Sequence, residues 1–459
     1  MSHRWTLVLA SLGLFMTALD TLVVTTALPV LRTSLDAGLS GLEWTVNAYN
    51  LAFACFLLTG AALGDRFGRR RMFTLGLGGF ALASAAAALS PSAEALVLAR
   101  GLQGAAAAMV APLSLTLISE AFPVEKRGAA IGLWGGIGGL AVAAGPVVGG
   151  AVVDGLDWHW MFWINVPIGL VLVPLCLRKL TESHGPSTRL DLTGLALATA
   201  GAFGLTWGLI RANDAGWGSG EVVAAFVAGA LLVAAFLRWE RRTAHPMVPP
   251  SLFRARGFAT ANAVSFCMYA GLFGALFLMS QLLQTGLGYS PLEAGLRLLP
   301  WSFAPMVFAP IAGALADRFG NRPFMALGLA CQATGLALVA AIAKTGMGYG
   351  ELALAFTVAG IGTSLCFPTA AAASMSAVAP EQAGVASGVN NACRELGGVF
   401  GVAVLASVFA ANGGYASPAA FLAGFPPALW VAVVVSAAGI LAALFTAGRG
   451  RAELAGAPA

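Results

Sequence analysis

The chain has 459 residues, of which 58% are hydrophobic and 10% are charged, and its formal net charge is +5. Soluble domains carry about 25% charged residues, so this composition excludes an ordinary soluble globular protein. Apolar stretches of about 20 residues, long enough to cross a hydrocarbon core of about 30 Å, recur along the whole sequence. The composition therefore predicts an all-α polytopic membrane protein.

Polar residues separate the apolar stretches into fourteen predicted transmembrane spans. In chain order they cover residues 5–30, 44–63, 72–90, 95–119, 128–153, 160–178, 190–210, 220–238, 257–284, 292–315, 323–343, 350–376, 388–411 and 424–446. The first span shows no A-x-A cleavage site, so we expect it to be retained rather than removed as a signal peptide. All six cysteines fall inside spans without metal-ligand spacing, which predicts core residues and no metal site.

One short charged motif occurs in each half of the chain. Residues 63–71 read LGDRFGRRR, and residues 315–322 read LADRFGNR. An internal repeat of this kind predicts two homologous halves, each with a charged hairpin between two of its helices. Spans seven and eight lie between the halves and lack the motif. The sequence therefore predicts an N-terminal six-helix bundle over residues 1–185, a two-helix insert over 186–245 and a C-terminal six-helix bundle over 246–459.

Lys and Arg are distributed unevenly between the two sets of connections. With the N-terminus in the cytoplasm, most basic residues fall in cytoplasmic connections, among them the arginines of both charged motifs. The positive-inside rule then predicts that both termini are cytoplasmic, because the number of spans is even. We expect a multi-pass protein of the cell (inner) membrane. This asymmetry explains the net charge, so nucleic acid is not a predicted partner, and a monomer is expected because no extra interface signature stands out.

Two ionisable residues of opposite charge lie inside predicted spans at matching depth. Asp20 lies 15 residues beyond Trp5, which is about 22 Å from the cytoplasmic end of span one. Arg100 lies about 5 residues into span four, which starts outside, or roughly 8 Å below the outer boundary. In a core of about 30 Å these depths agree, so the two side chains could meet.

The Asp20–Arg100 pair has a functional and a structural interpretation. An ionisable residue inside a span is costly and is a functional hypothesis by default. If its surroundings alternate between wet and dry, the Asp20 carboxylate can load and release a proton. Arginine does not deprotonate, so Arg100 would modulate the carrier. The alternative is a structural pair that locks two helices together.

The first charged motif resembles a family signature. The pattern Ala61-x-Leu63-x-Asp65-Arg66-x-Gly68-Arg69-Arg70 is similar to the loop 2–3 motif of the major facilitator superfamily. Ala61 stands where the family has its first glycine, and Gly313 restores that glycine in the second copy.

Further stretches narrow the resemblance to the fourteen-helix drug/proton antiporter branch of that family. Residues 19–29 (LDTLVVTTALP) resemble its first-helix motif, although Leu22 and Thr25 replace the usual threonine and asparagine. Residues 98–104 (LARGLQG) resemble the helix-four motif with its buried arginine, and residues 145–150 (GPVVGG) resemble the helix-five antiporter motif. Two more familial stretches are residues 160–167 (WMFWINVP) and residues 386–391 (ASGVNN) with Arg394.

The resemblance implies a fold and roles for particular residues. The fold is the major facilitator fold, with two six-helix bundles and two inserted helices that work by alternating access. Proton coupling is assigned to Asp20 and Arg100. The conformational switch loops are assigned to Asp65, Arg66, Gly68, Arg69, Gly313, Asp317, Arg318 and Gly320, and the antiporter motif to Gly145, Pro146, Gly149 and Gly150.

The glycines and Pro146 also have a plain physical interpretation. Glycine permits tight turns and close approach of helices, and proline frees a backbone carbonyl and kinks its helix. Helix five is then either a packing element or a gate that seals one side during exchange. These two interpretations do not exclude each other.

Several polar residues in or near the spans are candidates for a substrate cavity. They are Tyr49, Gln103, Asn165, Asn262, Gln281, Asn390, Asn391 and Arg394. A large apolar cavity with few polar partners suits amphipathic organic molecules better than sugars. The alternative for each residue is an ordinary hydrogen bond between helices.

Glu395 follows Arg394 directly and departs from the family pattern, which commonly has a neutral polar residue there. Three interpretations are open: an ion pair with Arg394, a pair with a nearby basic loop, or a second titrating site.

The sequence thus predicts a non-enzymatic secondary transporter that exports hydrophobic or amphipathic drugs or natural products in exchange for protons. No Walker A loop is present in the sequence, which argues against ATP as the driving force. The proton gradient is the expected driving force, and no cofactor is expected. Two alternatives remain: an exporter of one specific metabolite on the same fold, and a non-transporting membrane receptor or lipid-handling protein.

Overall fold

The computed structural model describes residues 3–184, 191–243, 246, 248, 250–343, 347–378 and 383–446. Some side chains within the helices, chiefly in the fifth helix and including that of Asp317, lie outside the described part. The described residues form helices joined by short connections, with no strand among them. Long apolar sequences form helices in a membrane because every backbone hydrogen bond is then made within the segment.

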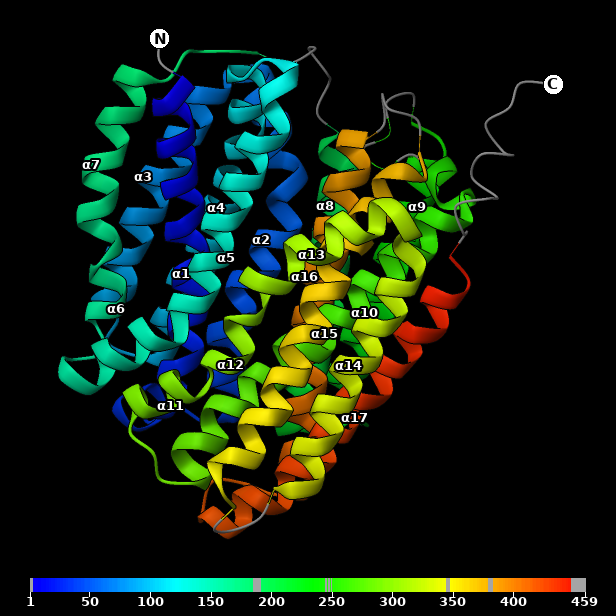
Figure 1. The fold of residues 1–459 in the computed structure, drawn as a ribbon. Helices are drawn as coiled ribbons and strands as arrows, with labels where there is room; N and C mark the ends of the chain where they lie inside the picture. Colours follow the sequence, from blue (N-terminus) through cyan, green and yellow to red (C-terminus); the bar gives the residue numbers. More distant parts are fainter. Residues whose placement is uncertain are drawn as a thin grey trace.

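In chain order, the helices form an N-terminal group, a pair from the middle of the sequence and a C-terminal group (Figure 1). The first group is α1 (His3–Ser34), α2 (Leu39–Phe67), α3 (Arg69–Ala88), α4 (Ala93–Ala121), α5 (Val124–Gly155), α6 (Trp160–Trp163) and α7 (Asn165–Lys179). The middle pair is α8 (Leu192–Ala215) and α9 (Gly220–Glu240). The last group is η1 (Pro250–Arg254), α10 (Arg256–Gln281), η2 (Leu282–Gly286), α11 (Pro291–Arg297), α12 (Leu299–Ser302), α13 (Ala304–Phe319), α14 (Asn321–Ile342), α15 (Tyr349–Ser376), α16 (Ala383–Asn412) and α17 (Pro418–Leu444).

The predicted number of fourteen spans is not confirmed. Within the described residues, twelve helices are long and apolar enough to cross a membrane, or thirteen if the bent helix α2 counts as one span. The helix absent from this count is α5, which has 32 residues. An all-helical, multi-pass architecture is nevertheless clear.

The predicted span over residues 292–315 is interrupted, contrary to expectation. It is divided into α11, α12 and α13, with breaks at Leu298 and Phe303. Pro300 and Pro305 stand in the first turns of α12 and α13. Proline is tolerated in a first helical turn but disfavours a helical conformation of the residue before it, so each proline favours a new start.

The middle pair lies against both groups. Helix α8 packs against α9, and it also contacts α2 of the N-terminal group and α16 of the C-terminal group. Trp44 on α2 lies 5.5 Å from Trp207 and 6.0 Å from Phe203 on α8, measured between ring centroids. Helix α8 therefore covers one seam between the two bundles, and α9 packs on α8.

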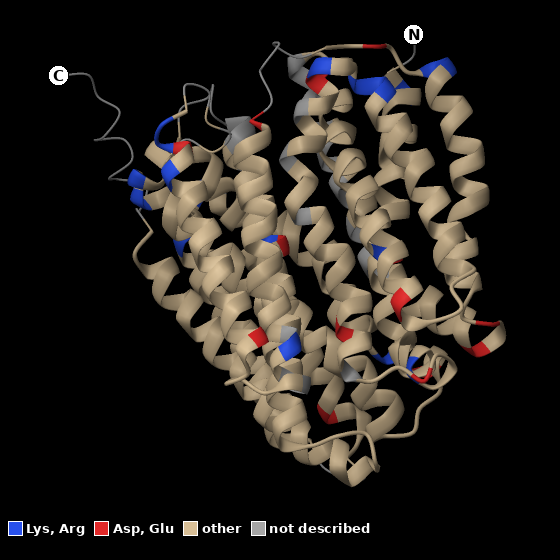
Figure 2. Cartoon of the chain, turned by 180° about the vertical axis from the view of Figure 1, so that it is seen from behind, with Lys and Arg blue, Asp and Glu red and all other residues tan. Residues whose placement is uncertain are grey.

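The two ends of the molecule differ in charge. Figure 2 shows Lys and Arg gathered mainly at the end where the chain termini lie. We call this the basic end; there α2 leads into α3 at Gly68, which takes a positive φ of 105°. The opposite end, where α1 leads into α2, is the far end.

Candidate functional site

Asp20 and Arg100 meet inside the N-terminal bundle. Arg100 Nη1 on α4 donates a hydrogen bond to Asp20 Oδ2 on α1, and the two residues are 1% and 2% exposed. The depth argument from the sequence predicted this contact, and the structure confirms it. A buried ion pair is retained only where further hydrogen bonds satisfy its remaining atoms, so its other contacts decide what it can do.

Helix α2 packs closely on α4 and contacts Arg100 as well. A Cβ atom on Gly104 would lie 2.2 Å from the backbone oxygen of Tyr49, so only glycine permits this approach. Arg100 Nε donates to the Thr45 carbonyl over 3.1 Å, and its guanidinium lies 4.4 Å from the Tyr49 ring centroid. Arg100 is therefore fixed by α2 as well as by Asp20.

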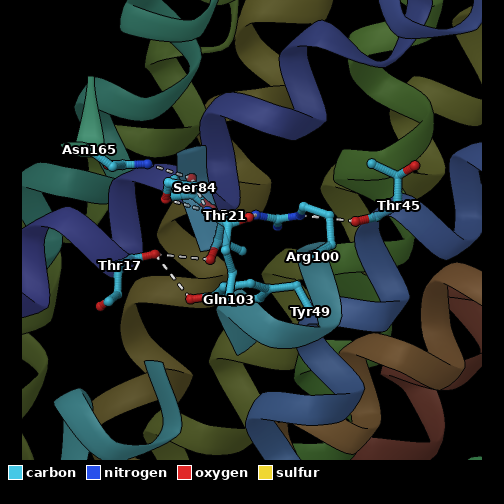
Figure 3. A network of polar contacts seen from close by, with 9 residues as sticks. Thr17, Thr21, Thr45, Tyr49, Ser84, Arg100, Gln103 and Asn165 are labelled. Carbon is cyan, nitrogen blue, oxygen red and sulfur yellow. Dashed lines mark hydrogen bonds and ion pairs between the residues drawn. The ribbon is translucent and has the colours of Figure 1, made fainter. Parts of the chain in front are cut away.

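Gln103 and Asn165 complete the shell around Asp20, and Figure 3 labels both of them together with Arg100, Ser84 and Tyr49. Gln103 Nε2 and Asn165 Nδ2 donate to Asp20 Oδ1 over 3.2 and 2.8 Å. Gln103 also donates to Ser84 over 2.7 Å and accepts from Arg100 over 2.9 Å. Both residues were predicted as substrate-cavity residues, whereas their observed partner is the carboxylate. We call Asp20, Arg100, Gln103, Asn165 and Tyr49 the N-bundle centre.

A second charged group lies in the C-terminal bundle. Arg394 on α16 donates from Nη2 to the Tyr269 hydroxyl on α10 over 2.7 Å. Its guanidinium carbon lies 4.2 Å from the Phe367 ring centroid and 4.7 Å from that of Tyr269. We call Arg394, Glu395, Tyr269 and Phe367 the C-bundle centre.

Arg394 and Glu395 form no ion pair, so this interpretation of the sequence was wrong. Neither residue has an oppositely charged side chain within 4.0 Å in the described part of the chain. Neighbours on an α-helix point in directions about 100° apart, which explains why two consecutive residues do not face each other.

The other predicted cavity residues mostly bond to neighbouring helices. Asn390 donates to Asn262 over 3.1 Å and to Ser265 over 2.8 Å, and all three are buried. Gln281 donates to its own helix and accepts from Tyr415. Asn391 is partly exposed and has no hydrogen bond among the described residues. Except for Asn391, these residues therefore fit the alternative interpretation, in which they make hydrogen bonds within and between helices.

The first switch loop is held by carboxylates that sequence reasoning did not connect to it. Arg69 forms an ion pair with Asp65 over 2.7 Å and another with Glu120, at the end of α4. The Glu182 carboxylate accepts from the backbone N–H groups of Arg70 and Arg71, at the start of α3. The available signal was the presence of acidic residues in connections otherwise rich in arginine. Arg66 is exposed and stacks on Phe67.

The second switch loop shares with the first its turn and an arginine that stacks on the next phenylalanine. Gly320 has a φ of 83°, which matches the positive φ of Gly68. Gly313 was expected to permit close helix approach, but nothing lies within 4 Å of the position that its Cβ would occupy. Among the described residues no helix packs on Gly313, so this expectation is not met in the present conformation. Arg318 stacks on Phe319, and the Asp317 side chain lies outside the described part.

Helix α5 connects the two bundles at the far end. A Cβ on Gly295 of α11 would lie 2.0 Å from the Pro146 oxygen, and one on Gly150 would lie 2.4 Å from the Pro291 oxygen. Gly145 and Gly149 pack in the same way against Leu22 and Val23 of α1. The predicted antiporter motif thus packs α5 on α1 with one face and on the opposite bundle with the other.

Other contacts between the bundles lie in the same half of the molecule. Gln284 and Ser280 both donate to the Thr26 carbonyl, over 2.7 and 3.3 Å. The Arg32 guanidinium lies 4.2 Å from the Tyr415 ring centroid. Between described residues, the hydrogen bonds and ring contacts that join the two bundles all lie in the far-end half.

Comparison with known proteins identifies relatives over nearly the whole chain. The family model described as Major Facilitator Superfamily matches residues 10–251 and 261–458. The chain is 37% identical to the multidrug resistance protein Stp of Mycobacterium tuberculosis, over 88% of this chain and 76% of that protein. It is 35% identical to the tetracenomycin C resistance and export protein of Streptomyces glaucescens (90% and 77% covered) and 35% identical to the drug efflux pump JefA of M. tuberculosis (94% and 85% covered).

Solved structures of distant sequence share the fold. A POT family transporter in complex with a thioalcohol-conjugated peptide superposes with a TM-score of 0.72 at 14% identity, over 94% of each chain. The xylose transporter XylE from E. coli, in a partially occluded inward-open conformation, gives a TM-score of 0.66 at 16% identity over 96% of each chain.

Proposed function

We propose a coupling mechanism for this chain, which belongs to the drug-efflux branch of the major facilitator superfamily and is a transporter rather than an enzyme. In this mechanism, hydrophobic or amphipathic organic molecules are exported in exchange for protons. The observation that carries the proposal is the buried Asp20 carboxylate with its shell of three donors. A carboxylate inside a membrane bundle is the expected place for proton binding.

The donors around Asp20 suit a group that gains and loses a proton. As a carboxylate, Asp20 accepts from Arg100, Gln103 and Asn165. When a proton binds one oxygen, the carboxyl group becomes neutral and one acceptor position is lost. Arg100 then keeps the Thr45 carbonyl, the Gln103 oxygen and the Tyr49 ring as partners. Its charge remains supported in both states, so protonation loosens the link between α1 and α4 without leaving Arg100 unpartnered.

Alternating access would use the contacts at the two ends. The α5–α11 contact closes the far end in the present state, and opening it would separate Pro146 from Gly295. The Asp65–Arg69–Glu120 cluster belongs to the N-terminal bundle alone here. In the opposite state, the first switch loop would turn toward the C-terminal bundle, which fits its assignment as a switch.

The overall organisation proposed from the sequence fits this mechanism. Counting α5 and the bent α2 with the twelve candidate helices makes fourteen spans. Residues 1–185 and 246–459 would form the moving bundles, and residues 186–245 the insert. We place the basic end and both termini in the cytoplasm of the cell (inner) membrane, following the positive-inside rule, and we take the protein to act as a monomer.

The test is substrate-triggered proton movement in inverted membrane vesicles. Vesicles acidified inside would receive a panel of lipophilic cations and neutral drugs, with wild type compared with Asp20→Asn. Asp157→Asn is a matched control, because its side chain is 61% exposed in a far-end connection. We expect the pH gradient to collapse with wild type and with Asp157→Asn, but not with Asp20→Asn.

Two other outcomes have distinct meanings. Equal collapse with wild type and Asp20→Asn would make Asp20 structural and point to Glu395 instead. Absence of any response to the panel would favour the exporter of one specific metabolite or a non-transporting receptor.

A further inference from the structure

Arg394 is a cation inside the membrane bundle, and no carboxylate of the described residues is in direct contact with it. It lies 11 residues into α16, about 17 Å along the helix from Ala383, and is only partly exposed. In the described part of the chain, no carboxylate oxygen lies within 4.0 Å of it. A buried or half-buried cation normally has an ionic partner, because removal from water is costly.

Most of the hydrogen-bonding capacity of Arg394 is unused. A guanidinium has five N–H donors in a fixed plane, and among the described residues Arg394 makes one hydrogen bond, to the Tyr269 hydroxyl. The Nε atom is buried and has no hydrogen-bond partner in the same part of the chain. By contrast, Arg100 bonds to Asp20, Gln103 and the Thr45 carbonyl. Unmade bonds of a buried donor carry a penalty, so an acceptor from outside the chain would be favoured here.

The surroundings of Arg394 are aromatic. Besides contacting Arg394, the Tyr269 ring lies 5.2 Å from Phe273 and 6.3 Å from Phe367, measured between centroids. Aromatic rings at these distances favour stacking with a further planar ring. The rings hold the guanidinium plane in place, and a fork of donors in a fixed plane matches a carboxylate.

Glu395 affects the electrostatic potential at Arg394 without occupying its hydrogen-bond donors. Glu395 is on α16, and this helix packs against α2 of the N-terminal bundle and against α10 of the C-terminal bundle. The Glu395 side chain is partly exposed and makes no hydrogen bond or ion pair among the described residues. It therefore offsets part of the Arg394 charge at longer range while leaving the donors of Arg394 open.

We propose that Arg394 anchors the acidic group, a carboxylate or an ionised phenol, of a planar aromatic substrate whose rings stack among Tyr269, Phe273 and Phe367. This inference rests on the proposed export of organic molecules and specifies the substrate class. When Glu395 is ionised, it lowers the affinity for such an anion by like-charge repulsion.

The test measures binding of two xanthene dyes to the purified full chain in nanodiscs by fluorescence polarisation. Fluorescein carries acidic groups, and rhodamine 6G is a cation with the same tricyclic core. The variants are Arg394→Gln, Arg394→Lys and Glu395→Gln. Arg297→Gln is the matched control, because Arg297 also stacks on a tyrosine, 3.8 Å from the Tyr289 centroid, but lies near the far end. Thermal unfolding of each variant confirms that it is folded.

We expect wild type to bind fluorescein more tightly than rhodamine 6G. Arg394→Gln should weaken fluorescein binding by about tenfold or more, which corresponds to about 1.4 kcal/mol, and leave rhodamine 6G within about twofold. Arg394→Lys should fall between, since it keeps the charge and loses the planar fork. Glu395→Gln should tighten fluorescein binding, and Arg297→Gln should change neither dye.

The inference would be overturned if wild type failed to bind fluorescein, or if Arg394→Gln left fluorescein binding unchanged. Equal loss of both dyes in Arg394→Gln, or equal loss of fluorescein in Arg297→Gln, would also overturn it. These failures are distinguishable from failure of the proposed function. Proton movement triggered by rhodamine 6G in wild type and Arg394→Gln vesicles would support antiport even if the anion site does not exist.

Discussion

The N-bundle centre and the C-bundle centre each contain an arginine beside tyrosine in the interior of a helical bundle, yet they are constructed differently. Arg100 faces a carboxylate, and both members of that pair are surrounded by bonded partners. In the part of the chain that the structure describes, Arg394 has one hydrogen bond and two aromatic contacts, and the carboxylate next to it in sequence does not pair with it.

The difference indicates two kinds of task. A charge that is balanced inside the protein responds to a change within the pair, such as the binding of a proton. A charge that is left unbalanced responds to what arrives from outside, such as an anionic ligand. Each of the following variants tests whether the two centres differ in this way.

The largest expected effect is on folding stability after removal of either arginine. Arg100→Met leaves the buried Asp20 without its countercharge, and breaking a buried pair costs about 3–5 kcal/mol. Arg394 has no carboxylate within 4.0 Å among the described residues, so Arg394→Met removes no ion pair. The expected loss of folding stability is below about 1 kcal/mol. Thermal unfolding of both variants in the same detergent measures the contrast, and equal losses would remove the distinction between the centres.

A double-mutant cycle compares the coupling within each centre. Asp20→Asn with Arg100→Gln should show a coupling energy of about 2–3 kcal/mol, because the two side chains are in direct contact. Glu395→Gln with Arg394→Gln should be additive to within about 0.5 kcal/mol. Denaturation of the four single and two double variants gives both values. Strong coupling in the second cycle would mean that Arg394 and Glu395 act as a pair.

Removal of the amide in the N-bundle centre should have an intermediate effect. Gln103→Leu removes bonds to Asp20, Ser84 and Arg100, and unsatisfied buried partners cost about 1–3 kcal/mol. The rate of substrate-triggered proton movement in vesicles should fall, because Gln103 no longer fixes the positions of Asp20 and Arg100 relative to each other. Asn390→Leu is a control with similar burial outside the centre, and it should lower stability without a comparable effect on proton movement.

The smallest effect is expected from the tyrosine of the C-bundle centre. Tyr269→Phe removes the hydroxyl that accepts from Arg394 and keeps the ring, at a cost of about 1 kcal/mol or less. Because a further donor of Arg394 becomes open, fluorescein affinity should stay the same or rise up to about threefold. A loss of fluorescein binding in polarisation measurements would show that Tyr269, not Arg394, holds the ligand.

Much of the fold and part of the site could be predicted from the sequence. Most predicted spans overlap a long helix, because a segment must be apolar and about 20 residues long to cross the membrane. The contact of Asp20 with Arg100 followed from their matching depth. The interruption near Pro300 and Pro305 was missed because an apolar run hides a break that depends on local backbone geometry.

The details of the site could not be predicted, because they depend on which faces of the helices meet. The sequence predicted Gln103 and Asn165 as cavity residues. In the structure they lie on α4 and α7, and both donate to the Asp20 carboxylate. Glu120 and Glu182 lie 51 and 112 residues from the arginines that they contact, beyond the reach of any local pattern.

The sequence by itself determined that this chain is a polytopic membrane protein with one charged motif in each half and an ionisable pair at one depth. These features depend on composition, on repeated motifs and on the fixed rise per residue of a helix. Only the tertiary structure decided which charges are balanced. Rotation of each helix about its axis sets the partner of every side chain, and the packing of all neighbouring helices determines that rotation. For this reason Arg100 has a carboxylate in contact, whereas Arg394, with a glutamate next to it in sequence, has none among the described residues.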